Sequence, residues 1–376
     1  MQPLSGLTVL DFSTLLPGPM AALILAEAGA EVIKIERPGI GDEMRAYPPF
    51  LGGESINFAL LNRGKQSLAL DLKSPADRAR LAPLLARADI LIEQFRPGVM
   101  ARMGLDFATL AKQHPGLIYC SITGFGQDGP MAQIAAHDLN YIAMTGLLSL
   151  SRGPDDAPVI PPALIADIAG GAYPAAMNIL LALEARRQTG TGQHLDISMT
   201  DNMFPLAWWA LGQRAATGQT PGNADTLLSG GTARYRLYPT SDGQILAAAP
   251  IEDRFWANFC AAIGLPDALR DDRKDPAATL QAVTDIIARQ TATHWKTTFA
   301  DTDCCATLVT TLDEALAEPH FRHRGIEAYR TAMAGDTIPA LPVPIAPSFR
   351  AAPDADAAAP TLGSADLRDD SPAPPK

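Results

Sequence analysis

The sequence is poor in the residues that build disulfide frameworks and metal centres. Only four cysteines occur, and the one close pair, Cys304 and Cys305, is adjacent in the chain and badly placed for a mutual disulfide. The six histidines are scattered, and the closest pair, His320 and His323, has no third ligand nearby. We therefore expect reduced thiols in a cytoplasmic protein, with no resident metal and no redox cofactor.

Positive charge and long apolar runs are also scarce. The 30 Lys and Arg residues are outnumbered by 41 Asp and Glu, and the net charge of −11 argues against a nucleic-acid partner. The acidity lies mostly after residue 110, so an anionic ligand is expected to prefer the N-terminal third. The longest early apolar run, residues 20–30, is too short to cross a bilayer, and no membrane partner is expected.

What is present is the composition of a folded enzyme. The chain of 376 residues is 47% hydrophobic and 19% charged, which excludes a disordered protein. This length favours two domains or one elaborated domain.

The first 130 residues alternate between strand and helix patterns. A β-rich run at residues 7–12 leads through a Pro/Gly turn into a helical run at 20–28 and a second strand at 31–35, which is a βαβ unit. Ser74 and Pro75 open another helix between two further strands. Residues 106–116 predict one more helix, followed by a strand. The predicted fold class is α/β, with a doubly wound sheet.

Domain boundaries follow from the rest of the chain. We expect a large Rossmann-like domain at residues 1–200, which includes a long helix at 167–187, and a smaller α+β domain at 225–320. A Pro-rich return segment to the large domain is expected at 330–350, and a flexible tail at 351–376.

The first turn of the βαβ unit argues against a dinucleotide. Glu36 closes the second strand, as in NAD-binding folds, but the turn reads STLLPGPM and not G-x-G-x-x-G. Pro17 and Pro19 remove two backbone N–H donors there, so an NAD dehydrogenase is disfavoured.

Basic residues recur near the predicted strand ends instead. Ligands of open α/β sheets bind at the carboxyl ends of strands, where a ligand with several phosphates would collect such side chains. The residues are Lys34, Arg37, Arg63, Lys65, Lys73 and Arg96.

A His–Asp pair stands inside an apolar segment, IAAHDLNYIAMTGLL. Burying His137 and Asp138 is costly unless both are hydrogen-bonded or needed for chemistry. Two interpretations remain open from these residues alone, a capped helix or a catalytic base with its support.

Several separated stretches together form a recognisable pattern: LSGLTVLDF, LAEAGAEVIKIERP, NRGKQSLALDLKS, ADILIEQFRPGVMARMGLD, LIYCSITGFGQDGP and GTGQHLDISMTD. Through them, residues 1–345 resemble the CaiB/BaiF group, the family III CoA-transferases. The resemblance implies a large Rossmann-like domain and a smaller domain, two chains interlocked as a homodimer, and an acyl-CoA thioester as ligand. It implies CoA-binding roles for Arg37, Lys73 and Arg96, and also for Arg63 and Lys65.

The resemblance also implies catalytic residues. Transferases of this family use an aspartate nucleophile, which falls on Asp167, although Asp167 alone would read as a helix N-cap. The branch resembling alpha-methylacyl-CoA racemase adds a histidine in an H-D-x-N-Y setting, matched here by His137 with Asp138, Asn140 and Tyr141 as support. A glutamate from the smaller domain completes that site. It falls on Glu252, which alone would read as an ordinary carboxylate in the first turn of a helix.

The expected activity is epimerisation of 2-methylacyl-CoA thioesters. Inverting the α-carbon requires proton removal on one face and return on the other, so two flanking acid–base groups are the simplest solution. The enolate oxygen also needs donors, for which the backbone N–H of Asp138 is suited. The main alternative is a CoA-transferase acting through Asp167. A non-catalytic acyl-CoA-binding protein is a further alternative.

Overall fold

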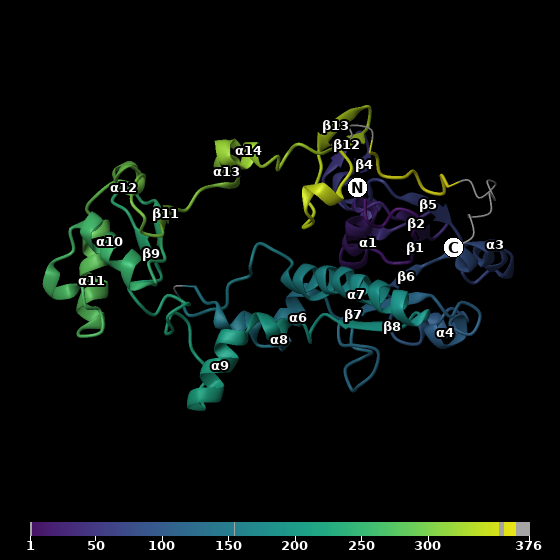
Figure 1. Ribbon diagram of the computed structural model, residues 1–376, viewed down its shortest axis with the longest axis horizontal. Helices are drawn as coiled ribbons and strands as arrows, with labels where there is room; N and C mark the ends of the chain where they lie inside the picture. The colour runs from purple at the N-terminus through teal and green to yellow at the C-terminus, as the bar shows by residue number, and fades with distance from the viewer. Residues whose placement is uncertain (1, 154, 353–356, 366–376) are drawn as a thin grey trace. The chain divides into compact units, whose positions relative to one another are not determined.

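The chain folds into two units (Figure 1). The computed structural model describes residues 2–153, 155–352 and 357–365. The large unit comprises residues 1–147, 160–206 and 322–376, and the small unit comprises residues 148–159 and 207–321.

The large unit is built on a six-stranded parallel sheet with the order β5-β2-β1-β6-β7-β8 (Figure 1). Read in chain order, this is the doubly wound arrangement of dinucleotide-binding folds, so the predicted Rossmann-like α/β fold is confirmed. The strands are β1 Thr8–Asp11, β2 Glu31–Glu36, β5 Gln66–Ala69, β6 Ile90–Glu93, β7 Ile118–Thr123 and β8 His194–Ser198. Most of their residues are buried, because helices cover both faces of a parallel sheet.

Helices pack on each face of this sheet. On one face, α3 (Pro75–Arg87) buries Leu81 and Leu84 against Leu10 and Ile33. On the other, α1 (Pro17–Glu27) and α7 (Tyr173–Thr189) share an apolar cluster with α2 (Ile56–Asn62). Ser74 caps α3 by accepting from the Asp77 N–H at 3.3 Å, as predicted. The α1 helix begins earlier than predicted, because a proline at N1 has no N–H to satisfy.

The predicted helix at 167–187 is two segments. A π-helical turn, η3 (Ala166–Ala172), precedes α7. Pro174 cannot donate to the carbonyl of Gly170, and the Asn202 side chain donates to that oxygen at 2.8 Å instead. Proline chemistry therefore explains the change of helical type, and the amide of Asn202 replaces the missing donor.

The whole run Ala166–Thr189 is long and apolar enough to cross a membrane by length and composition. Within the large unit, however, Ala172 and Ala176 of this run pack against Leu23 of α1. One side of this run therefore belongs to the core of the large unit.

The small unit contains a three-stranded antiparallel sheet with the order β11-β10-β9. Its strands are β9 Arg236–Pro239, β10 Ile245–Ala248 and β11 Ala306–Leu308. Its larger helices are α9 Trp208–Thr217, α10 Asp253–Ile263, α11 Pro276–Ile287 and α12 Ala292–Phe299. Tyr238, Trp256, Phe259 and Trp295 belong to its core, so it has an apolar centre of its own.

The small unit exceeds the predicted 225–320, because it also includes α9 and the excursion 148–159. This excursion interrupts the predicted large domain at 1–200. Two hydrogen bonds tie it to the small unit: the Arg152 N–H donates to the Asn223 side chain at 3.4 Å, and the Asn223 amide donates to the Arg152 carbonyl at 3.0 Å.

The C-terminal residues return to the large unit. A hairpin of β12 (Arg330–Met333) and β13 (Asp336–Pro339) opens the return. The described part of the predicted flexible tail, 357–365, runs beside the edge strand β5, where the Ala365 N–H donates to the Ser67 carbonyl at 2.8 Å. These residues are held because an uncovered sheet edge offers unpaired backbone groups. Residues 353–356 and 366–376 lie outside the described residues.

The remaining elements are short. The predicted helix at 106–116 is reduced to α5, Phe107–Leu110, before Pro115. The others are η1 Glu43–Ala46, β3 Phe50–Leu51, β4 Glu54–Ser55, α4 Val99–Arg102, α6 Asp138–Met144, η2 Leu147–Leu150, α8 Met203–Leu206, η4 Asp267–Leu269, α13 Leu312–Ala317, α14 Pro319–His323 and η5 Pro347–Phe349.

Candidate active site

The loops that follow β1 and β6 line two of the cavities in the large unit. Strand order reverses between β1 and β6, which is where ligands of doubly wound sheets bind. The first, the His137 cavity, has a volume of about 270 Å³ and is lined by His137, Tyr141 and Asp167 among others. The second, the Arg37 cavity, has a volume of about 630 Å³. Phe95 lines both cavities.

His137 is the residue that immediately precedes α6. Its backbone is extended, with φ −129° and ψ 177°, and its side chain is exposed at the His137 cavity. The side chain of Asn140 accepts a hydrogen bond from the His137 backbone N–H at 3.0 Å. Asn140 therefore fixes the backbone turn that carries the imidazole of His137.

Asp138 is buried, and one oxygen of its carboxylate accepts two hydrogen bonds from backbone donors. Its Oδ1 accepts from the N–H of Ala166 at 2.7 Å and from the N–H of Asp167 at 3.0 Å. The sequence predicts that Asp138 supports His137. The hydrogen bonds of its carboxylate instead go to the segment that carries Asp167. As the first residue of α6, Asp138 also has a backbone N–H without an acceptor inside the helix.

Asp167 has the opposite environment. Its side chain makes no hydrogen bond with the residues that the structure describes, and it is not the N-cap of η3, so the helix-cap interpretation of Asp167 is wrong. Burial, and then the negative charge of Asp138, raise the pKa of Asp167 to about 7. A carboxyl group with this pKa can both give and take a proton near neutrality.

Tyr141 forms part of the wall of the His137 cavity. Its hydroxyl donates to the carbonyl of Ala136 at 2.7 Å, and its ring packs edge-on against Phe125 at 5.5 Å. A Cβ at Gly124 would lie only 2.5 Å from this ring, so the close approach requires glycine there. Burial, followed by the charges of Asp167 and Asp138, raises the pKa of Tyr141 to about 12, and the phenol stays protonated. Tyr141 thereby holds the chain just before His137.

Three predicted CoA-binding residues are exposed at the two cavities. Arg37 and Lys73 both line the Arg37 cavity, and Arg96 lines the His137 cavity. Arg37 makes only an exposed pair with Glu43 at 3.4 Å, which costs little to exchange for a ligand phosphate. The cations therefore lie at the ligand edge of the sheet, as predicted.

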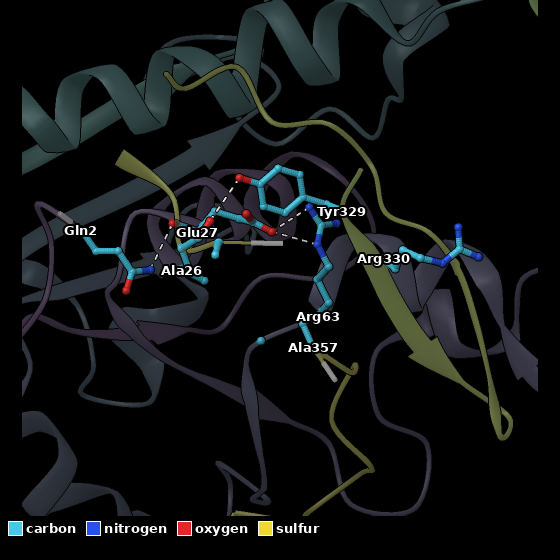
Figure 2. Close-up of a pocket in the computed structure, with 10 residues that line it drawn as sticks. Gln2, Ala26, Glu27, Arg63, Tyr329, Arg330 and Ala357 are labelled. Carbon is cyan, nitrogen blue, oxygen red and sulfur yellow. Dashed lines mark hydrogen bonds and ion pairs between the residues drawn. The ribbon is translucent and has the colours of Figure 1, made fainter. Parts of the chain in front are cut away.

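Arg63 does not lie there, and its predicted CoA contact is corrected. It is 2% exposed, and its guanidinium donates to Glu27 at 2.8 Å and to the carbonyls of Leu60 and Leu341, both at 2.7 Å. Figure 2 shows Arg63 directed toward Glu27 at the edge of a small cavity that Tyr329 also lines. Because Arg63 precedes β5, it approaches the sheet from its amino end, away from the ligand edge.

Lys65 requires the same correction. Its ammonium group is buried and donates to Asp11 at 3.0 Å, to Asn62 at 2.8 Å and to the carbonyl of Pro19 at 2.9 Å. All three donors are used, so none remains for a phosphate. Burial lowers its pKa to about 8, although Asp11 opposes the shift.

Lys34, another of the recurring basic residues, is also buried and shapes the β1–α1 loop. Its ammonium contacts Asp42 at 2.9 Å and donates to the carbonyl of Ser13 at 2.7 Å. The other Asp42 oxygen accepts from the N–H of Leu15, whose backbone is left-handed at φ 62°. Such strain in a non-glycine residue persists only where the surroundings enforce it. This loop lines both cavities, and its ionic support was not foreseen from the sequence, where Lys34 reads as a strand-end cation.

Glu93, the last residue of β6, was also missed. Its Oε2 accepts from the N–H of Phe95 at 2.8 Å, so it anchors the loop shared by the two cavities. Burial raises its pKa to about 7, with Asp196 as a further contributor. The position of Glu93, a carboxylate at the carboxyl end of a central strand, is the sequence signal that could have identified it.

Glu252 belongs to the small unit, whereas His137 and Asp167 line one cavity of the large unit. It is the N-cap residue of α10, but its side chain makes no capping hydrogen bond. The carboxylate is exposed and has no partner among the described residues. The Glu252 carboxylate therefore does not stabilise the start of α10 by a hydrogen bond.

Metal ligation has no support in this geometry. In the parts of the chain that the structure describes, no three His, Cys, Asp or Glu side chains are grouped to hold a metal ion. The site offers acid–base and nucleophilic groups beside exposed cations.

Comparisons with known proteins identify the family of this chain. The family model described as CoA-transferase family III matches residues 4–366. Human alpha-methylacyl-CoA racemase is 34% identical over 362 residues, covering 93% of this chain and 90% of the relative. Acetyl-CoA:oxalate CoA-transferase of Acetobacter aceti is 36% identical over 305 residues, covering 78% and 77%.

Solved structures show the same architecture. A CaiB/BaiF family protein from Brucella suis superposes with a TM-score of 0.80 at 30% identity and covers 96% of each chain. Both racemases and transferases are therefore similar to this sequence over most of its length. The chain belongs to the CoA-transferase family III, the CaiB/BaiF family, and is an enzyme of this transferase and racemase superfamily.

Proposed function

We propose that the protein interconverts the R and S epimers of a 2-methylacyl-CoA. The observation that carries this proposal is that His137 and Asp167 line one cavity, with the pKa of Asp167 raised to about 7 by burial. A proton is taken from the α-carbon on one face, the thioester becomes an enolate, and a proton returns on the other face. Each group needs hydrogen-bond reach to its proton and a pKa near the working pH, and Asp167 meets the second condition.

The substrate's CoA portion occupies the Arg37 cavity in this proposal. Arg37 and Lys73 contact its phosphates, and Arg96 lies beside the His137 cavity on the loop between the two. The shared wall at Phe95 is consistent with one extended ligand that reaches from cations to acid–base groups. The backbone N–H of Asp138 donates to the enolate oxygen. This chemistry needs no metal and no redox cofactor.

Glu252 completes the site from a second copy of the chain in an interlocked homodimer. Apolar side chains on α6 and α7 of the large unit support an interface, because Met144, Met177 and Leu181 are 53%, 57% and 62% exposed. Such an apolar surface on a water-soluble chain is typical of a protein contact.

The test uses one pure epimer of a 2-methylacyl-CoA in D₂O, without added free acid. Uptake of one deuterium at the α-carbon with conversion to the other epimer is expected, followed by mass spectrometry and chiral chromatography. His137→Ala and Asp167→Ala should each lower the exchange rate about 10²–10⁴-fold. Absence of exchange from both epimers would contradict the proposal for that acyl class.

A CoA-transferase is the second candidate, because Asp167 is an unpartnered carboxylate beside the cations. As nucleophile, its oxygen would attack the thioester carbonyl and release CoA thiolate, leaving a mixed anhydride. The thiolate would then attack the aspartyl carbonyl, forming an aspartyl-CoA thioester and the free acid. A pKa of about 7 leaves this carboxyl partly protonated at neutral pH, which favours proton transfer over attack. CoA transfer to an added carboxylate, with a CoA adduct on Asp167, would support this alternative.

A further inference from the structure

Glu252 depends on its neighbours for its direction. Its backbone is extended, with φ −71° and ψ 144°, directly before α10. A carboxylate at an N-cap normally accepts from the first turn of the helix and is oriented by that bond. The side chain of Glu252 makes no such bond, so the backbone on either side must set where it points.

Arg234 contacts both residues that flank Glu252. Its Nη1 donates to the carbonyl of Ile251 at 2.9 Å and to Oδ1 of Asp253 at 2.7 Å. Arg234 is 8% exposed, so its guanidinium is largely buried in the small unit, although the Asp253 side chain is 73% exposed.

The opposite edge of the guanidinium also makes hydrogen bonds. Its Nε and Nη2 donate to the two carboxylate oxygens of Asp272 at 2.9 and 2.8 Å, a bidentate pair. The ring of Trp256, from the core of the small unit, lies 5.1 Å from the guanidinium carbon. Asp272 and Trp256 therefore hold the Arg234 guanidinium in place independently of its contacts with Ile251 and Asp253.

Helix α10 does not depend on these contacts in order to form. Its first turn is closed by the Trp256 N–H, which donates to the Glu252 carbonyl at 2.9 Å. Its inner face buries Trp256, Phe259 and Cys260 in the core. The two bonds from Arg234 Nη1 fall on the residues next to Glu252, namely the carbonyl of Ile251 and the carboxylate of Asp253, the first residue of α10.

We propose that Arg234 is a positioning residue that orients the Glu252 carboxylate for the reaction. This inference rests on the proposed function, in which Glu252 completes the epimerase site. Only arginine offers planar donors that bind Asp272 bidentately while reaching two further acceptors. Lysine keeps the charge and loses the fork.

A double-mutant cycle on α-proton exchange in D₂O tests this assignment. Arg234→Lys is measured in the wild-type chain and in the Glu252→Gln chain, with thermal unfolding recorded for each. If Arg234 acts through Glu252, its replacement slows exchange about 10- to 100-fold in the wild type, since small misplacements of a reacting group have effects of this size. In the Glu252→Gln chain the same replacement changes the rate less than about twofold.

Arg254→Lys is the matched control. Arg254 is on the same helix, but its side chain is 71% exposed and pairs with Asp303, so the control should retain wild-type exchange. Equal losses from Arg234→Lys in both backgrounds would show a general structural effect and overturn the inference. An unchanged rate in the wild-type background would also overturn it. Absence of exchange in the wild type itself would refute the proposed epimerase, and this inference would fall with it.

Discussion

The two aspartates near this site differ in the number of hydrogen-bond donors around their carboxylates. Asp138 is the first residue of α6 and Asp167 lies in the first turn of η3, yet two backbone N–H groups donate to Asp138 and none of the described donors binds the Asp167 side chain. A carboxylate without donors in a buried place is hard to ionise, so the two side chains take different chemical roles. The backbone N–H groups of Ala166 and Asp167 donate to Asp138, which leaves the Asp167 carboxylate available for chemistry.

Replacing Asp167 by asparagine should raise stability at high pH only. Its pKa in the folded protein, about 7, is above the ordinary value of 3.8, so the folded state holds the extra proton between these values. The free energy of unfolding contributed by this group therefore falls as pH rises from about 4 to about 7. We expect Asp167→Asn to be more stable than wild type by about 1–3 kcal/mol at pH 8 and nearly equal at pH 4.5. Urea unfolding followed by circular dichroism measures this, and an equal difference at both pH values would contradict it.

The two classes of basic residue should give different kinetic effects. Arg37→Ala or Lys73→Ala should raise the KM for an acyl-CoA about 3- to 30-fold with little change in kcat, because each loses a ligand contact. Arg63→Ala should instead lower the free energy of unfolding by about 2–4 kcal/mol, since it removes one of the two arginines that pair with Glu27 and the donor to the carbonyls of Leu60 and Leu341. Initial rates and urea unfolding on the same preparations separate the two. A higher KM for Arg63→Ala at unchanged stability would restore it as a ligand residue.

At the scale of elements, the turn η3 places Asp167 under tight packing. A Cβ at Gly170 would lie 2.7 Å from the carbonyl oxygen of Met199 and the same distance from Met203 Cε. A backbone oxygen cannot move aside as a flexible side chain can. The pair Gly170–Gly171 therefore allows the Met199 segment to approach closely.

Gly170→Ala should accordingly destabilise the protein by about 1–3 kcal/mol through overpacking. It should also lower turnover, because Asp167 lies in the same turn. Gly212→Ala is the matched control, since Gly212 is inside α9, where an added Cβ would meet no atom within 4 Å, and it should be neutral or stabilising by about 0.5–1 kcal/mol. Thermal and urea unfolding give the comparison. A stable Gly170→Ala variant would mean that the turn can relax.

The regular alternation of strand and helix patterns made the fold of the large unit predictable from the sequence. The direction in which individual side chains extend was not predictable. Alternating strands and helices, with Ser74 before Pro75, indicated the doubly wound sheet and the α3 cap. They could not indicate that Lys65 extends inward to Asp11, because a basic residue beside a strand reads the same whether it faces water or a buried carboxylate. The pairing of His137 with Asp167 came from the family resemblance, since 29 positions separate Asp138 from the Asp167 N–H that it binds.

At the scale of the whole molecule, the candidate residues come from two units of one chain. His137 and Asp167 belong to the large unit and Glu252 to the small unit. If each site takes its large unit from one chain and its small unit from the other, two inactive variants can complement each other.

Coexpressed Asp167→Asn and Glu252→Gln chains should therefore recover about a quarter of wild-type exchange, because half of the dimers are mixed and each mixed dimer has one intact site. Each variant expressed alone should retain only about 10⁻² to 10⁻⁴ of wild-type exchange. Differently tagged chains allow the mixed dimer to be purified and its mass measured. A mixed dimer without activity would place each site within a single chain.

The large unit is closed by residues from both ends of the chain. Glu27 pairs with Arg350, which lies 323 positions later, at 2.8 Å, and residues 357–365 run along β5. On the ribosome, at about 5–20 residues per second, Glu27 waits on the order of tens of seconds for that partner. During that interval the newborn N-terminal sheet has an open edge, and Glu27 has Arg63 but not Arg350 as a partner. Chaperones should accordingly bind the nascent chain most while the last third of the mRNA is still being translated.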